Sequence, residues 1–326
     1  MTKADSEMRR VKIIGSAAPS ESLILGIEGG GTRITALLSD ERRRILGRGL
    51  AGPSNPVTVG FEAAEREILT AARQALASIH PRRRSKLKAV CLGLAGADRP
   101  EISRPLAAWL RKELPARTHL VTTDLALALE VAVGAGPGIV VIAGTGSIAC
   151  TRDARGQLLG AGGWGSAWDD AGSGYDLGRQ AVRAALRALD SRGPRTSLGR
   201  VIARGLGLDG ITGIVALRLD PQRIASLAPL VIQAAGRGDK VARYLLDQAG
   251  RDLAELALAL IRRAGLKRKR LPVVCAGGLF RSSPALRRSF ARHLRRQAPG
   301  VQIRVLRGEP VAGALTLAVR SIATTL

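Results

Sequence analysis

Residues 23–38 read LILGIEGGGTRITALL, and residues 138–150 read GIVVIAGTGSIAC. Each stretch contains an apolar run, a turn of glycine and threonine, and a second apolar run, which together predict a strand, a tight turn and another strand. Because the pattern occurs twice in one chain, it predicts a duplicated domain whose two turns face each other across a cleft.

Strands and helices alternate around these two hairpins. Apolar residues at helical spacing predict helices over 61–79 and 125–133, and short apolar runs predict strands over 87–94, 119–122 and 138–143. This alternation predicts an α/β fold. Beyond residue 171 the sequence predicts mainly helices, at 176–189, 221–235, 239–264, 284–296 and 310–322, with strands at 271–276 and 301–305.

The length of the chain suits two domains. It has 326 residues, of which 46% are hydrophobic and 24% charged, enough to bury two cores. We expect a disordered lead-in over residues 1–21, an N-terminal domain over 22–123 and a C-terminal domain over 124–326. We expect the second domain to carry a helical insertion at about 176–265. The closing helix, 310–325, belongs to the second domain in sequence but could pack on the first.

The apolar segments and the cysteines indicate the cellular compartment of the protein. No apolar run approaches the roughly 20 residues that span a bilayer, and residues 1–21 lack the apolar centre of a signal peptide. Cys91, Cys150 and Cys275 lie in or beside apolar runs without metal-ligand spacing, which predicts buried strand residues. We therefore expect a cytoplasmic protein with no membrane partner.

The chain is strongly basic, with 51 Lys and Arg against 26 Asp and Glu and a net charge of +25. Basic runs at 42–44, 82–84 and 267–270 would suit nucleic acid. However, only 2% of the residues are aromatic, and the basic runs are dispersed along the chain. A specific nucleic-acid function is therefore disfavoured, and attraction for anionic nucleotides and phosphosugars is the preferred account.

The two glycine turns predict a phosphate site. Glycines at 29–31 remove every Cβ, so backbone N–H groups can approach an anion closely, and Thr32 adds a hydroxyl donor. The spacing fits neither the G-x-x-x-x-G-K-[ST] loop nor G-x-G-x-x-G. The turn at 144–147 offers the same groups, so the two turns could hold a polyphosphate from both sides. The alternative is a pair of glycine turns without a ligand.

Thr122-Thr123-Asp124 stands where a predicted strand ends and a helix begins. Asp124 could be the N-cap of that helix, since aspartate is preferred there. A carboxylate at the carboxyl end of a strand is also well placed to act as a base for a substrate hydroxyl. Both interpretations of Asp124 stay open at this point.

Residues 162–175 read GGWGSAWDDAGSGY, an unusual loop in a chain with three Trp. Aromatic faces and carboxylates are typical of sugar pockets, although a structural turn with core tryptophans would use the same residues. Gly277 and Gly278 follow a predicted buried strand, where a base or ribose could lie on the backbone. A plain left-handed turn is the alternative there.

In this order the motifs resemble those of the N-acetylglucosamine kinases, glucosamine kinases and BadF/BadG-type ATPases, over about residues 23–317. The resemblance implies an actin-like (ribonuclease H-like) ATPase fold, with two duplicated α/β domains around an interdomain cleft. The motifs that carry it are residues 26–33 (GIEGGGTR), 93–97 (GLAGA), 122–124 (TTD), 143–147 (AGTGS), 162–165 (GGWG), 276–278 (AGG) and 310–314 (PVAGA).

The resemblance also implies roles for individual residues. Asp124 would be the catalytic base, and Glu28 would act on Mg²⁺ indirectly. The ATP site would comprise Gly30, Gly31, Thr32, Thr145 and Gly146 at the phosphates, with Gly277 and Gly278 at the adenosine. The sugar site would comprise Asn55, Asp124, Gly162, Gly163 and Asp170.

The implied activity is transfer of a phosphoryl group from ATP, with Mg²⁺, to the 6-hydroxyl of N-acetylglucosamine or glucosamine; a homodimer is left open. Two departures leave the sugar undecided. Ala171 replaces a family glutamate, and Ile148 stands where animal relatives carry asparagine. The alternative is an ATP-driven activator without sugar kinase activity, although such activators use paired cysteines for an iron–sulfur cluster and no cysteine here sits in a glycine-rich motif.

Overall fold

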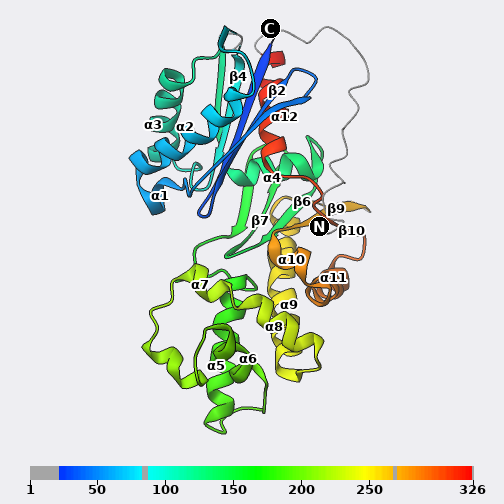
Figure 1. Ribbon diagram of the computed structural model, residues 1–326. Helices are drawn as coiled ribbons and strands as arrows, with labels where there is room; N and C mark the ends of the chain where they lie inside the picture. The colour runs from blue at the N-terminus through cyan, green and yellow to red at the C-terminus, as the bar shows by residue number, and fades with distance from the viewer. Residues whose placement is uncertain (1–21, 83–86, 267–269, 325–326) are drawn as a thin grey trace, which may run out of the picture.

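The computed structural model describes residues 22–82, 87–266 and 270–324, so the expected lead-in over 1–21 lies outside the described residues. Two five-stranded sheets form the frame of the molecule (Figure 1). The first has the order β3-β2-β1-β4-β5 and contains β1 (Leu23–Gly29), β2 (Ile34–Asp40), β3 (Ile45–Ala51), β4 (Leu87–Leu94) and β5 (Thr118–Thr122). The second has the order β10-β9-β6-β7-β8 and contains β6 (Ile139–Ala143), β7 (Ser147–Arg152), β8 (Leu158–Gly162), β9 (Leu271–Ala276) and β10 (Val301–Val305).

The two sheets have the same topology. In each, a glycine-turn hairpin (β1–β2 or β6–β7) continues into a third antiparallel strand. The first strand of each hairpin is also parallel to a later strand, and that strand to the next. Read from β8 to β10, the second sheet repeats the first strand for strand. The duplicated α/β fold predicted from the two glycine turns is confirmed.

The first sheet is covered by helices on both faces. Its helices are α1 (Pro56–Val59), α2 (Phe61–Ala77), α3 (Pro100–Glu113) and α4 (Asp124–Val133). Alternation along β1 sends Leu23 and Leu25 into a core shared with α2 and α3, while Ile24 joins a second core on the other face. That second core is completed by Leu315 of the closing helix α12 (Val311–Thr324).

Helices α4 and α12 lie between the two sheets (Figure 1). Leu127 of α4 belongs to the core that α12 makes with the first sheet, whereas Leu129 packs with Val140 and Val274 of the second sheet. A Cβ added at Gly313 would lie 2.3 Å from the Leu127 carbonyl oxygen, so α12 and α4 are in close contact there. Helix α12, which follows the second sheet in the sequence, therefore packs on the first sheet, and α4 packs on both. The boundary between domains at residue 124 stays a prediction.

The second sheet packs against a largely helical segment. Its helices are α5 (Gly174–Leu189), α6 (Leu198–Gly205), the 3-10 helix η2 (Ile211–Ala216), α7 (Pro221–Ala225), α8 (Ala228–Gly236), α9 (Lys240–Arg263), α10 (Gly278–Ser282) and α11 (Pro284–Gln297). The prediction of one helix over 221–235 is wrong, because α7 and α8 are separate. Pro229 has no N–H for the Ala225 carbonyl, and its ring would clash with that group in a continuous helix. Among the described helices, none is both long and apolar enough to cross a bilayer.

Candidate functional site

A pocket of about 580 Å³ opens where loops from the two sheets meet. Strands β1, β4 and β5 are parallel, as are β6, β9 and β10, so each set presents its carboxyl ends along one edge of its sheet. The predicted residues that line the pocket are Asn55, Asp124, Gly146, Gly163 and Asp170. Gly162 precedes Gly163 in the sequence but does not itself line the pocket.

The first glycine turn is held by backbone hydrogen bonds. The Ser54 N–H donates to the Gly30 carbonyl at 3.0 Å, and the Ala95 N–H donates to the Gly29 carbonyl at 3.2 Å. A Cβ added at Gly30 or Gly31 would meet nothing within 4 Å. Since packing does not demand glycine at these two positions, their bare backbone leaves open space for a ligand, as a phosphate site requires.

The second glycine turn is fixed from helix α5. The Gly174 N–H donates to the Gly144 carbonyl at 2.8 Å, and the Tyr175 N–H donates to the Thr145 carbonyl at 3.0 Å. Thr145 itself is exposed. A Cβ added at Gly144 also meets nothing within 4 Å. The turn is thus rigidly positioned while its outer side stays open, which fits the predicted contact with ATP phosphates.

Asp170 has a structural task besides lining the pocket. Its Oδ1 accepts a hydrogen bond from the Ser147 N–H at 3.0 Å, and its carboxylate lies against Gly146, where an added Cβ would be 2.8 Å away. The backbone of Asp170 is left-handed, with φ of 61°. Burial raises the pKa of this carboxyl, and the hydrogen bond from Ser147 opposes the shift. Asp170 therefore couples the second glycine turn to the predicted sugar pocket.

Gly277 and Gly278 lie at the end of β9, beside the end of β6. Gly277 has φ of 95°, and a Cβ there would lie 2.2 Å from the Ala143 carbonyl oxygen, so only glycine fits. At Gly278 an added Cβ would meet nothing within 4 Å. The predicted adenosine-binding pair therefore adjoins the second glycine turn, and its second member leaves room for a ligand.

Asp124 is the first residue of α4, but Thr123 is the N-cap. The Thr123 Oγ1 accepts from the Ala126 N–H at 3.1 Å, which satisfies the helix end. Asp124 Oδ1 accepts from the Leu125 N–H at 3.0 Å. Burial raises the pKa of Asp124 to about 6, helped by the nearby charge of Asp98. A carboxylate that is not the cap, lines a pocket and has a raised pKa is suited to accept a proton.

Glu28 is the penultimate residue of β1 and lies close enough to Asp124 for the two charges to interact. Burial, and then the charge of Asp124, raise the pKa of Glu28 to about 7, although Arg33 opposes the shift. Among the described residues there is no group of three or more His, Cys, Asp or Glu side chains that could hold a metal ion. Mg²⁺ commonly binds through one or two carboxylates plus substrate phosphates and waters, and Glu28 fits that mode.

Asn55 is oriented by its own helix. It is the N-cap of α1, and its Oδ1 accepts from the Val57 N–H at 3.0 Å. That bond uses the oxygen and leaves the amide nitrogen to donate to a hydroxyl in the pocket. The predicted sugar contact of Asn55 is therefore sterically and chemically available.

The tryptophans of the 162–175 loop are not pocket residues. Trp164 is 76% exposed and Trp168 is 87% exposed, and neither lines the pocket. Gly162 and Gly163 have φ of 77° and 76°, and a Cβ at Gly163 would lie 2.4 Å from Ile148. The glycines allow the tight turn of this loop, and neither tryptophan ring reaches the pocket.

Sequence reasoning missed several pocket residues. Arg99 is the only cation among the residues that line the pocket, and Asp98, Leu158 and Gly160 line it too. Asp98 and Arg99 directly follow the 93–97 motif, so their position in the sequence was a usable signal. Leu158 and Gly160 lie on β8, which was not predicted.

Comparisons with known proteins identify the family of the chain. The model of the BadF/BadG/BcrA/BcrD ATPase family matches residues 25–318. The chain belongs to this family. An N-acetylmuramic acid/N-acetylglucosamine kinase of Clostridium acetobutylicum is 31% identical over 299 residues, covering 90% of this chain and 97% of the relative. An N-acetyl-D-glucosamine kinase of Dictyostelium discoideum is 28% identical, covering 93% of this chain and 99% of the relative.

Solved structures show the same fold. A protein of Chromobacterium violaceum, provisionally assigned as an N-acetylglucosamine kinase, has 30% identity and a TM-score of 0.74, covering 91% of this chain and 99% of its own. A ROK family glucokinase of Streptomyces griseus, solved with glucose and AMPPNP, has a TM-score of 0.62 at 20% identity, covering 92% and 100%. The predicted family and the actin-like sugar kinase fold are confirmed.

Proposed function

We propose that the chain is an ATP-dependent kinase that phosphorylates N-acetylglucosamine or glucosamine at the 6-hydroxyl. The observation that carries the proposal is Asp124, a carboxylate with a raised pKa in a pocket that also reaches Gly146 of the second glycine turn. The names of the relatives support an amino sugar as the acceptor.

In this mechanism the residues of the chain position two substrates. Gly30, Gly31 and Thr32 hold ATP phosphates from one side, and Thr145 with Gly146 holds them from the other. Asn55 donates to a sugar hydroxyl, and Asp124 accepts the proton of the 6-hydroxyl as the bond from O6 to the γ-phosphorus forms and the bridging P–O bond breaks. Positioning dominates such transfers.

Mg²⁺, when bound, would neutralise charge on the phosphates, and Glu28 would hold it through water. The raised pKa of Glu28, about 7, reflects first its burial and then the charge of Asp124. A cation beside Glu28 would favour its ionised form. The chain itself supplies Arg33, which opposes the raised pKa of Glu28 and follows the first glycine turn.

Arg99 bears on which amino sugar is used. Its guanidinium lies at the pocket with Asp98 and Asp124, and it has no ion pair among the described residues. The Clostridium relative is named for N-acetylmuramic acid, an amino sugar that carries a carboxylate. We include that sugar in the proposed substrate range, with Arg99 pairing with its carboxylate.

A panel assay tests the proposal. The protein is given ATP, Mg²⁺ and, separately, N-acetylglucosamine, glucosamine, N-acetylmuramic acid and glucose, and sugar-dependent ADP release is measured. Phosphorus NMR of the product identifies the phosphorylated hydroxyl. Arg99→Gln should lower the rate with N-acetylmuramic acid relative to N-acetylglucosamine. If no amino sugar accelerates ADP release, the kinase proposal fails.

The ATP-driven activator remains the second candidate, because Ala171 replaces the family glutamate. The cysteines disfavour it: Cys91, Cys150 and Cys275 are all buried in strands, where they could not join a cluster between subunits. Steady ATP hydrolysis that no sugar stimulates would favour the activator. A homodimer and a cytoplasmic location stay predictions.

A further inference from the structure

A second cavity, of about 770 Å³, lies at the opposite end of α4 from Asp124. Helix α4 has 10 residues and is therefore about 15 Å long. Asp124 is its first residue, whereas the cavity is lined by its last residues and by segments of β9, β10 and α12. The cavity is thus separate from the proposed active site but shares a rigid element with it.

Four arginines line this cavity. They are Arg43, Arg270, Arg304 and Arg320, and the only carboxylate among the lining residues is Glu130. Glu130 is 4% exposed and accepts from Arg320 at 2.6 and 2.9 Å and from Arg152 at 3.2 Å. Two guanidinium groups therefore already neutralise the single negative charge.

The other three arginines have only neutral partners or none within the described part of the chain. Arg43 donates to the Thr316 hydroxyl at 3.3 Å, and Arg304 donates to the Gln302 side chain at 2.9 Å. Neither these two nor Arg270 takes part in an ion pair with a described carboxylate. Guanidinium groups that converge on one cavity without counter-charge repel one another, and a bound anion would remove that repulsion.

The arginines come from both halves of the fold. Arg43 lies in the turn between β2 and β3 of the first sheet, and Arg320 lies on α12, which covers that sheet. Arg270 precedes β9 and Arg304 lies in β10, both of the second sheet. An anion that contacts all of them would connect the two halves of the molecule.

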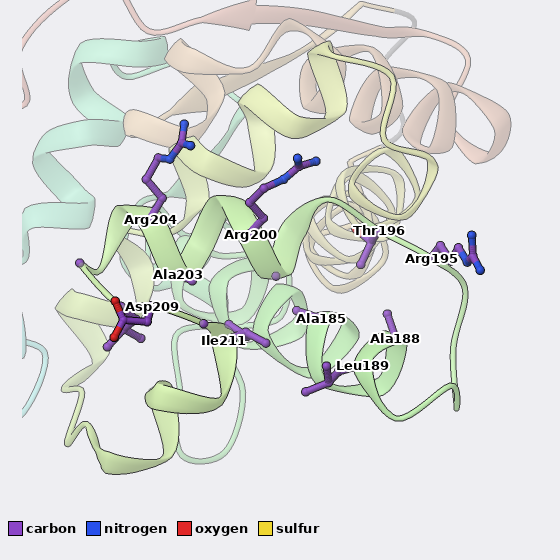
Figure 2. A pocket seen from close by; sticks show the side chains of 14 residues that line it. Ala185, Ala188, Leu189, Arg195, Thr196, Arg200, Ala203, Arg204, Asp209 and Ile211 are labelled. Atoms are coloured by element: carbon purple, nitrogen blue, oxygen red, sulfur yellow. The ribbon is translucent and has the colours of Figure 1, made fainter.

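A larger cavity, of about 830 Å³, lies between α5, α6 and η2 (Figure 2). Its arginines do not converge in this way. Figure 2 shows Arg200 and Arg204 extending from the side of α6 away from Ile211, Ala185 and Leu189. The cavity at the end of α4 is therefore the better anion site.

We propose that the arginine-lined cavity at the end of α4 binds a small phosphate-bearing anion and that binding fixes the two sheets relative to each other. Guanidinium groups pair with phosphate oxygens through two parallel hydrogen bonds, so three uncompensated arginines suit a compound with more than one negative charge. The anion could be inorganic or a sugar phosphate, since both carry this chemistry.

Calorimetric titration of the full chain tests the proposal, with inorganic pyrophosphate and glucosamine 6-phosphate as separate probes in buffer without Mg²⁺. The probe variant is the double substitution Arg43→Gln and Arg304→Gln, one arginine from each half. The control is the double substitution Arg295→Gln and Arg296→Gln, which removes the same amount of charge from two exposed positions of α11. We expect the probe variant to weaken binding about tenfold or more and the control by less than about twofold.

Thermal unfolding gives a second readout. A ligand that binds only the folded chain raises the midpoint of unfolding, so the better probe should raise it clearly less for the double variant than for wild type and control. If the double variant does not fold, Arg304→Gln alone replaces it. The proposal is overturned if neither probe binds, or if the two arginine pairs matter equally, because the anion would then respond only to net charge.

Discussion

Asp124 is the residue on which the proposed chemistry depends. In Asp124→Asn the side chain keeps its size and can still accept from the Leu125 N–H, but it no longer takes a proton. Since Thr123 caps α4, little stability should be lost. We expect kcat to fall by on the order of 10²–10⁴ with the KM for ATP near wild type. Steady-state kinetics with the best sugar of the panel measure this, and a rate within a few-fold of wild type would remove Asp124 from the mechanism.

The pKa of Asp124 sets a pH dependence. Burial and, less strongly, Asp98 hold this pKa at about 6, above the ordinary value for aspartate. A base works only in its ionised form, so kcat/KM for the sugar should be level at higher pH and fall about tenfold per unit below pH 6. Asp98→Asn removes a negative charge and should move the inflection to lower pH. An unchanged inflection in Asp98→Asn would contradict the assignment.

Thr145 tests the second glycine turn. Its side chain is exposed on a turn that α5 holds by backbone bonds, so Thr145→Val should remove a hydroxyl donor without moving the turn. We expect the KM for ATP to rise more than the KM for the sugar. Thr212→Val, an exposed threonine of η2, is the matched control and should change neither constant. Equal kinetics in Thr145→Val and wild type would exclude the hydroxyl from the phosphate site.

Individual site residues were predictable where a local motif carried them. The glycine turns and Asp124 stand in short motifs, and the structure brings Gly146 and Asp124 to one pocket. The choice between Thr123 and Asp124 as cap was not predictable, because it depends on the backbone angles at the helix start. Arg99 was missed because its role depends on the fold around it, and the exposure of Trp164 depends on the path of a whole loop.

At the scale of elements, the contact between α12 and α4 limits what Gly313 can become. A Cβ there would lie 2.3 Å from the Leu127 carbonyl oxygen, so Gly313→Ala must push two helices apart. We expect a loss of about 1–3 kcal/mol in the free energy of unfolding, measured by denaturant titration. The control is Gly236→Ala, in α8, where an added Cβ meets nothing within 4 Å. Stability equal to or above wild type is expected for Gly236→Ala, and a neutral Gly313→Ala would mean that the helices are not in tight contact.

Strongly apolar elements were predictable, and weakly patterned ones were not. The strand predicted over 271–276 has those bounds in the structure, because it is a continuous buried apolar run. Strand β3 was missed because Gly47, Arg48 and Gly49 interrupt its pattern. Those glycines are explained only in three dimensions: a Cβ at Gly49 would lie 1.9 Å from the Ala71 carbonyl oxygen of α2.

At the scale of the molecule, Glu130 forms ion pairs with an arginine from each half of the fold. Its carboxylate pairs with Arg152 of β7 in the second sheet and with Arg320 of α12 on the first. Glu130→Gln removes the buried charge that both arginines share, and we expect a loss on the order of 2 kcal/mol in the free energy of unfolding. Glu255→Gln, an exposed glutamate of α9, should cost less than about 0.5 kcal/mol. Equal losses of unfolding free energy in the two variants would mean that the ion pairs of Glu130 do not stabilise the molecule.

The duplication was predictable because its signal, the glycine hairpin, is local and occurs twice. The packing of α12 on the first sheet was not, since it brings residues far apart in the chain, such as Leu315 and Ile24, into one core. The resemblance helped with the fold but assigned the 310–314 motif no role. The structure gives it one: Gly313 and Ala314 allow α12 to approach α4 and β1 closely.

The position of α12 has a consequence for the order of events on the ribosome. One apolar face of the first sheet, including Ile24 and Ala89, is covered by α12, which spans Val311–Thr324. Domains made first during synthesis generally fold first. Here the half that emerges first must wait with an uncovered face until α12, which follows the whole second sheet in the sequence, has been made, so the nascent chain is a natural client for chaperones until then.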